Sequence, residues 1–208
     1  ESKARVGDWV VAVGNPFGLG GTVTAGIISA NGRDIGSGPY DNYLQIDAAV
    51  NRGNSGGPAF NLNGEVVGVN TAIFSPSGGS VGIGFAIPAA IVKNVIEDLK
   101  TNGAVTRGYL GVQIQPVSED IAEGLGLEKA EGAIITDLPE KSPAKTAGLK
   151  QGDTIVKANG ETIEDAKDLS LTVSRLKPGT TVPVEIVRDG KRQALGQPGR
   201  HAAMDVGG

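Results

Sequence analysis

Residues 53–58 read Gly-Asn-Ser-Gly-Gly-Pro, and the first half of the chain is arranged around the serine of this stretch. A strand-like run at 43–46 precedes it, and a run at 59–62 follows it, with a turn and another strand at 65–69 beyond, so Ser55 falls in a glycine-rich loop that joins predicted strands. Serine and glycine are common in loops, and Ser-Gly-Gly alone indicates no more than that. The same loop can also hold the N–H groups of Ser55 and Gly53 toward one point. A hydroxyl beside two convergent N–H donors is what acyl transfer requires, namely a nucleophile with an oxyanion hole.

A longer context favours the second interpretation. Residues 45–58 closely resemble the nucleophile region of trypsin-like serine proteases of the HtrA/Do (DegP-like) family. Residues 14–20 (Gly-Asn-Pro-Phe-Gly-Leu-Gly) and 82–88 (Gly-Ile-Gly-Phe-Ala-Ile-Pro) are similar to two further blocks of that family, in the same order. The resemblance implies that Ser55 is the nucleophile and that the backbone N–H groups of Gly53 and Ser55 form the oxyanion hole.

The resemblance also suggests how a substrate would be selected. Ala49, six residues before the nucleophile, stands where such enzymes line the specificity pocket. Without a carboxylate there, cleavage after a small aliphatic residue is favoured over cleavage after Lys or Arg. The polar, glycine-rich stretch 31–42 corresponds to an activation loop near that pocket. Asn54 replaces the Asp with which trypsin relatives bind a newly cut N-terminus, so we expect no such zymogen cleavage.

The chain departs from the family at the catalytic base. A triad needs a histidine and a carboxylate to orient it, and in this family both precede the serine. The only histidine is His201, far downstream of Ser55 in a polar tail, where we expect it to be solvated. The chain also begins at Glu1 without an initiator Met. We therefore predict a fragment that starts inside a protease domain and is inactive by itself.

Composition narrows the remaining possibilities. Among 208 residues, 33 are Gly and 4% are aromatic, which favours tight turns and strands over long helices. The net charge of −4 argues against a nucleic-acid partner. There is no Cys and one His, so we expect no disulfide, no metal site and no cofactor. No apolar run approaches the length that spans a membrane.

The first half is predicted to be a β-barrel followed by a helix. Glycine-rich residues 14–21 lack the Gly-Lys-Ser/Thr ending of a phosphate loop, so a nucleotide site is not indicated. A helix is predicted after Pro88, with Gly103 as its C-cap. Short strands with turn signals predict a mainly β fold with a six-stranded antiparallel barrel. The family resemblance implies that this barrel, over 1–102, is the second barrel of a trypsin-like protease domain. The predicted strands are 9–13, 26–29, 43–48, 58–62, 65–71 and 83–87.

The second half has a different pattern. After a linker at 103–108, a strand at 109–114 is predicted, then a short helix capped by Ser142 and a strand ending at the Asn159-Gly160 turn. A second helix carries Leu169, Val173 and Leu176 on one face, and a hairpin turns at Asp189-Gly190. Residues 109–195 resemble an HtrA-type PDZ domain, which implies a β-sandwich-like unit with two helices. The tail, 196–208, is predicted to be disordered.

The PDZ resemblance implies a peptide-binding site. Tyr109-Leu110-Gly111-Val112 would be its carboxylate-binding loop, through the N–H groups of Leu110, Gly111 and Val112. Ile114, Leu169 and Val173 would line the pocket for the last side chain. The alternative is that these apolar side chains only form core.

Together the resemblances imply a serine endopeptidase that degrades misfolded or unfolded proteins through a Ser55 acyl-enzyme and recognises peptide C-termini with its PDZ domain. Family members work in the periplasm as trimers or larger homo-oligomers. Two other classes remain open at this point: a non-catalytic peptide-binding module and a chaperone-like holding protein.

Overall fold

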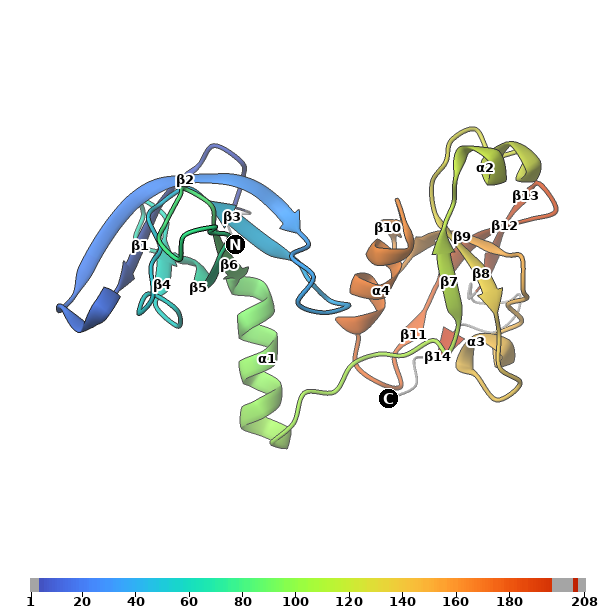
Figure 1. Ribbon diagram of the computed structural model, residues 1–208. Helices are drawn as coiled ribbons and strands as arrows, with labels where there is room; N and C mark the ends of the chain where they lie inside the picture. Colours follow the sequence, from blue (N-terminus) through green and yellow to red (C-terminus); the bar gives the residue numbers. More distant parts are fainter. Residues whose placement is uncertain (1–3, 196–203, 206–208) are drawn as a thin grey trace. The chain divides into compact units, whose positions relative to one another are not determined.

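The computed structural model describes residues 4–195 and 204–205 (Figure 1). Contacts within the chain divide it into two compact units between Val105 and Thr106. Strands dominate both units, as predicted for a mainly β protein. No described helix is long and apolar enough to cross a bilayer.

The first unit contains a closed barrel of six antiparallel strands, in the order β1-β2-β3-β6-β5-β4. This confirms the predicted architecture. Small and β-branched side chains such as Val10, Ile28 and Ile46 fill the interior. A short 3-10 turn, η1 (Pro16–Gly18), joins the first two strands. The strands are β1 (Trp9–Gly14), β2 (Thr22–Arg33), β3 (Tyr43–Ile46), β4 (Pro58–Phe60), β5 (Val66–Ile73) and β6 (Gly84–Pro88).

The long strand β2 curves around the barrel (Figure 1). Its register with β3 shifts after Ile28 and again after Ala30, and such bulges let a strand bend. Gly26 allows the backbone to approach closely, because a Cβ there would lie 2.2 Å from Asp47 Oδ1 and 2.3 Å from Ala48 N. The strand can therefore reach the segment that leads to the loop holding Ser55.

The predicted helix is α1 (Ala89–Asn102). It starts after Pro88 and ends at Gly103, whose φ of 70° and N–H bond to the Leu99 carbonyl make a left-handed C-cap. None of its residues is buried, and Ile96 is 49% exposed. The apolar residues of this helix thus remain partly open to solvent in this unit.

The second unit is built on a sheet with the order β13-β12-β9-β8-β7. The predicted hairpin at Asp189-Gly190 is present, and Asn159-Gly160 turns the chain from β9 into β10. A separate pair is formed by β11 and β14. The strands are β7 (Gln113–Pro116), β8 (Ala133–Asp137), β9 (Thr154–Ala158), β10 (Glu161–Thr162), β11 (Thr181–Val182), β12 (Val184–Arg188), β13 (Lys191–Leu195) and β14 (Met204–Asp205), and the helices are α2 (Glu119–Leu125), α3 (Pro143–Thr146) and α4 (Ala166–Ser174).

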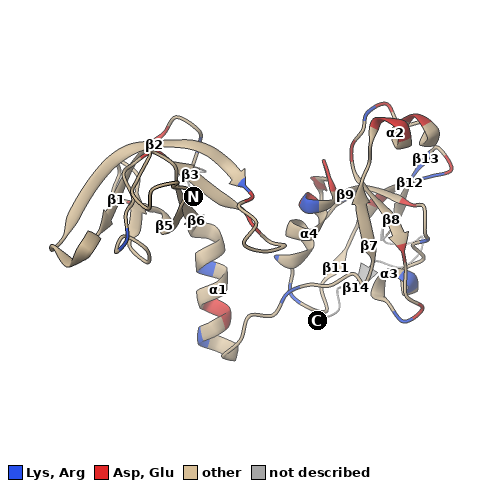
Figure 2. Ribbon diagram, viewed as in Figure 1, with Lys and Arg blue, Asp and Glu red and all other residues tan. Residues whose placement is uncertain are grey.

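The elements of this unit that were not predicted include α2 and β8, and with α2 its described part has three helices instead of two. Local signals for α2 are nonetheless present. Ser118 Oγ accepts the Ile121 N–H as an N-cap, and Gly126 ends the helix at a φ of 66°. The acidic residues at its start, visible in Figure 2, complement the helix dipole.

The prediction of a strand from residue 109 was wrong at its start, because β7 begins only at Gln113. Gly111, at a φ of 68°, turns the chain, and the Leu110 carbonyl accepts the Ala144 N–H at 3.1 Å instead of joining a ladder. The predicted disorder of 196–208 was wrong for Met204 and Asp205, which pair with β11. The other tail residues, including His201, lie outside the described residues.

A buried ion pair fastens β12 to the loop before β9. Arg188 Nε donates to Asp153 Oδ1 at 2.6 Å and Nη2 donates to Oδ2 at 2.7 Å, while Asp153 is 1% exposed. Nη2 also donates to the Gly148 carbonyl at 2.9 Å, and the Lys150 N–H donates to Asp153 Oδ2 at 2.8 Å. The hydrogen bonds to Asp153 raise the pKa of Arg188 further above its usual value.

Candidate functional site

Ser55 is exposed in a turn that is held by hydrogen bonds within the turn and to β5. The Asn54 N–H donates to the Asn51 carbonyl at 3.0 Å, and the Gly57 N–H donates to the Asn54 carbonyl at 2.9 Å. The Asn70 N–H of β5 donates to the Gly57 carbonyl at 2.9 Å. These bonds hold the backbone on both sides of the serine.

The same bonds orient the two predicted oxyanion donors. The Arg52 carbonyl accepts the Phe17 N–H at 3.0 Å, and the Asn54 carbonyl is bonded to Gly57. In a trans peptide the N–H points opposite to the carbonyl, so the N–H groups of Gly53 and Ser55 point away from these partners. Within the described part of the chain neither N–H donates a hydrogen bond. Two oriented, unused donors beside a hydroxyl can stabilise a negative oxygen.

The Ser55 hydroxyl itself donates to the Thr71 carbonyl at 2.9 Å. An amide carbonyl is far too weak a base to remove a hydroxyl proton, so this contact holds the side chain without activating it. The described residues contain no histidine. The turn therefore presents a hydroxyl beside two unused N–H groups, and no group that contacts this hydroxyl among the described residues can remove its proton.

The loop at 14–20 supports the turn, a role that sequence patterns did not assign to it. Besides the Phe17 contact, the Asn15 N–H donates to the Gly53 carbonyl at 3.2 Å, and Asn15 Oδ1 accepts the Gly20 N–H at 2.8 Å. Gly14 must be glycine, because a Cβ there would lie 2.7 Å from the Asn54 Cα. The resemblance of this block to the family was the one available signal.

Two further predicted positions, Ala49 and Asn54, lie on the segment between β3 and Ser55. Ala49 is exposed between buried Ala48 and Val50, and its carbonyl accepts the Thr24 hydroxyl at 2.8 Å. Its role in a specificity pocket stays a prediction. Asn54 is 1% exposed, and its Oδ1 accepts the Asn51 N–H at 3.3 Å.

The loop before β3 is closed by a buried carboxylate, Asp41, which is 4% exposed. Asp41 accepts the Ser37 hydroxyl at 2.6 Å and the N–H groups of Ser37 and Ile35 at 2.8 and 3.1 Å. The Ser37 hydroxyl also lies 2.8 Å from the Tyr43 hydroxyl. Burial raises the pKa of Asp41, but these hydrogen bonds outweigh it and hold the pKa below the ordinary value of 3.8.

This loop is therefore expected to loosen in acid. A carboxyl with a depressed pKa contributes stability above its unfolded-state pKa of 3.8, and that contribution disappears as the pH falls through the lower folded-state value. Amide hydrogen exchange over 34–42, corrected for intrinsic rates, should accelerate as the pH falls below 3.8. The Asp41→Asn variant should already show fast exchange in this loop at neutral pH. Asp120→Asn, an exposed carboxyl on α2, is the matched control. Equal protection of the loop in Asp41→Asn and the control would contradict this role.

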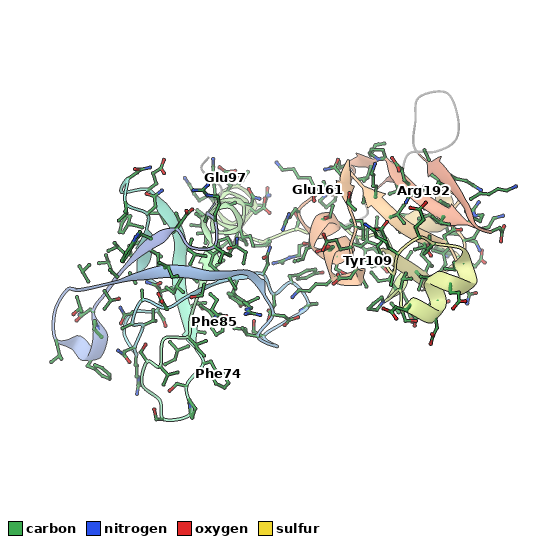
Figure 3. The ribbon with its side chains drawn as sticks, turned by 90° about the horizontal axis from the view of Figure 1, so that it is seen from above. Phe74, Phe85, Glu97, Tyr109, Glu161 and Arg192 are labelled. Carbon is green, nitrogen blue, oxygen red and sulfur yellow. The ribbon has the colours of Figure 1, made fainter. Side chains whose placement is uncertain are left out.

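In the second unit the predicted carboxylate loop rests on the start of α3. Ser142 Oγ caps that helix by accepting the Lys145 N–H at 3.1 Å. A Cβ on Gly111 would lie 2.7 Å from the Ser142 Cβ, so the close contact requires glycine. Tyr109 stands at the start of the loop and is 57% exposed (Figure 3).

The predicted pocket residues gather in one cluster. Leu169 and Val173 of α4 are buried, at 1% and 5% exposure, and belong to the core that also holds Leu110. Val112 and Ile114 are partly buried against that core. The two helix residues can therefore supply only the floor of a pocket, while Val112 and Ile114 retain surface that a ligand can touch.

Comparison with known proteins agrees with both units. Residues 1–69 match the model of the trypsin-like peptidase domain, and residues 108–196 match that of the PDZ domain. A "Probable periplasmic serine endoprotease DegP-like" of Rhizobium meliloti is 64% identical over 195 residues. The chain belongs to the HtrA/DegP-like family of serine endoproteases. A Chlamydia trachomatis relative with the same name is 52% identical over 192 residues.

Solved structures of the family show the same fold. The HtrA-type protease AlgW with a tripeptide is 40% identical, with a TM-score of 0.79 over 98% of this chain and 66% of that one. The serine endoprotease from Yersinia pestis is 36% identical, with a TM-score of 0.61 over 99% of this chain and 64% of that one. The aligned part is 94% of this chain but only 39% of the Rhizobium relative. The relatives' names place the family in the periplasm, as predicted.

Proposed function

We propose that Ser55 is the nucleophile of an endopeptidase and that the N–H groups of Gly53 and Ser55 form its oxyanion hole. The observation that carries this role is the pair of unused N–H donors beside an exposed hydroxyl, in a barrel of this family. Attack of Ser55 Oγ on a peptide carbonyl would place the developing oxyanion against these donors and expel the amine. Hydrolysis of the resulting ester would restore the serine. The proton of Ser55 must go to a base outside the described residues.

The proposed substrates are unfolded or misfolded proteins of the periplasm, cleaved after small aliphatic residues because Ala49 brings no charge to the specificity pocket. We also propose assembly as a trimer or a multiple of it. Support for location and reaction comes from the relatives, which are named periplasmic serine endoproteases. A casein-cleavage assay tests the reaction, using these residues joined to the N-terminal part of a relative, with Ser55→Ala as its control.

For the second unit we propose capture of a peptide C-terminus. The turn at Gly111 can direct the N–H groups of Leu110, Gly111 and Val112 toward one carboxylate. β7 is an edge strand, so an extended peptide can add to it. The last side chain would lie beside Val112, between Ile114 and the helix residues Leu169 and Val173. A second role for the chain in isolation is peptide binding without cleavage. The Ser55 hydroxyl is bonded to a carbonyl that cannot activate it, while the free edge of β7 can still accept a peptide.

A peptide with a free C-terminal carboxylate is expected to bind the chain with micromolar affinity, and the same peptide as an amide about tenfold or more weakly. Each charge-assisted hydrogen bond contributes about 1.5–3 kcal/mol and a buried Val or Leu side chain about 1.5–3 kcal/mol, but ordering of the peptide offsets much of this. Calorimetry with a Val-ending peptide, as acid and as amide, measures the difference. Equal binding of the two forms would show that the carboxylate is not recognised.

A further inference from the structure

The edge strand β7 ends in a proline, Pro116, which is exposed. Among the described strands β7 pairs only with β8, so its other edge is the one that a peptide would join. An added strand forms bonds only with backbone groups that point to that edge. Which residues of β7 point there therefore determines how much of a peptide can be held.

The hydrogen bonds of the partner strand β8 show which residues of β7 point to the free edge. Ile114 lies opposite Ile135 of β8. The Ile135 N–H donates to the Asp153 carbonyl at 2.9 Å, and its carbonyl accepts the Gly152 N–H at 2.9 Å. Both groups of Ile135 thus face away from β7, which makes Ile114 and Ile135 a pair without mutual hydrogen bonds. In such an antiparallel pair the N–H and the carbonyl of Ile114 must point to the free edge.

Backbone direction alternates along a strand, so Pro116, two residues after Ile114, faces the same edge. Its own partner in the register is Ala133. Proline has no N–H. The free edge consequently offers a donor and an acceptor at Ile114, but only an acceptor at Pro116.

We propose that Pro116 restricts this site to the last few residues of a free polypeptide C-terminus. This rests on the carboxylate capture proposed above. A peptide whose carboxylate is held at 110–112 runs antiparallel to β7, with its last residue beside Val112 and its third residue from the end beside Ile114. The fifth residue from the end then lies beside Pro116, where its carbonyl finds no donor.

The partner is therefore a short, frayed chain end with an apolar last residue, and a longer extended strand gains at most the single bond to the Pro116 carbonyl. Residues beyond about the fourth must still be ordered, at a cost in backbone entropy, without a complete pair of bonds in return. The missing donor also blunts the edge against pairing with another strand, a known use of proline in edge strands.

Calorimetry on the full chain tests the restriction with nested peptides of three, four, six and eight residues that share one Val-ending C-terminus. For the unmodified chain the affinity should stop rising at about four residues. Pro116→Ala restores an N–H, so it should strengthen binding of the two longer peptides about two- to tenfold, as one added hydrogen bond would. The two shorter peptides should bind unchanged.

Pro183→Ala is the matched control, because Pro183 is exposed in the same unit but lies between β11 and β12, away from β7. It should leave every affinity unchanged. Affinity that keeps rising up to eight residues in the unmodified chain, or no selective gain for long peptides in Pro116→Ala, would overturn the restriction while leaving carboxylate capture intact. Binding at no length would overturn both.

Discussion

The chain by itself should leave casein uncleaved, whereas the same residues joined to the N-terminal part of the Rhizobium relative should cleave it. The Ser55 hydroxyl bonds to the Thr71 carbonyl, which cannot remove its proton, and the only histidine lies in the tail. Oxyanion stabilisation and binding alone provide about 10³-fold acceleration over water, and the triad groups add a further factor on the order of 10³ or more. The joined protein should therefore exceed the single chain by at least about 10³-fold in casein turnover.

Release of labelled peptides from casein measures both proteins under the same conditions. Ser55→Ala in the joined protein should abolish release, and Ser29→Ala, a change in the barrel wall far from the turn in sequence, should retain it. Turnover by the single chain that disappears in Ser55→Ala would mean that another base acts on this serine. Turnover by the joined protein that survives Ser55→Ala would remove Ser55 from the mechanism.

Loss of the ion pair between Arg188 and Asp153 is expected to destabilise the second unit by about 3–5 kcal/mol. Asp153 is almost completely buried, so Arg188→Leu leaves its carboxylate without the bidentate partner that compensates for lost hydration. The guanidinium also bonds to the Gly148 carbonyl, so the loop before β9 loses two connections to β12 at once.

Lys157→Met is the matched control, since Lys157 and Glu185 form a pair at 3.4 Å between β9 and β12 with both side chains about two-fifths exposed. Such surface pairs contribute about 0–1 kcal/mol. In urea unfolding followed by circular dichroism, Arg188→Leu should have its midpoint at a clearly lower urea concentration than Lys157→Met. The fluorescence of Trp9, the only tryptophan, reports on the first unit and should be unchanged in both variants. Equal midpoints would mean that the buried pair contributes no more than the exposed one.

Most secondary structure in this protein follows from local sequence. Short apolar runs bounded by glycine and other turn residues specify the barrel strands, and Pro88 with Gly103 marks the ends of α1, because these signals act within a few residues. Likewise, Ser142 caps the helix that begins next to it, and Asn159-Gly160 forms the turn at its own position. The glycine-rich turn around Ser55 could be recognised for the same reason, since its glycines and serine are contiguous.

Tertiary structure decided what those local elements do. The Ser55 hydroxyl finds the Thr71 carbonyl only because β4 and β5 pair, and the Gly53 N–H is aimed by a bond between Arg52 and Phe17, which belong to different loops. The free edge of β7 is defined by bonds that Ile135 makes to the next segment of the sheet. Backbone direction, burial and hydrogen-bond partners at these points depend on segments far apart in sequence, and no local pattern encodes such pairings.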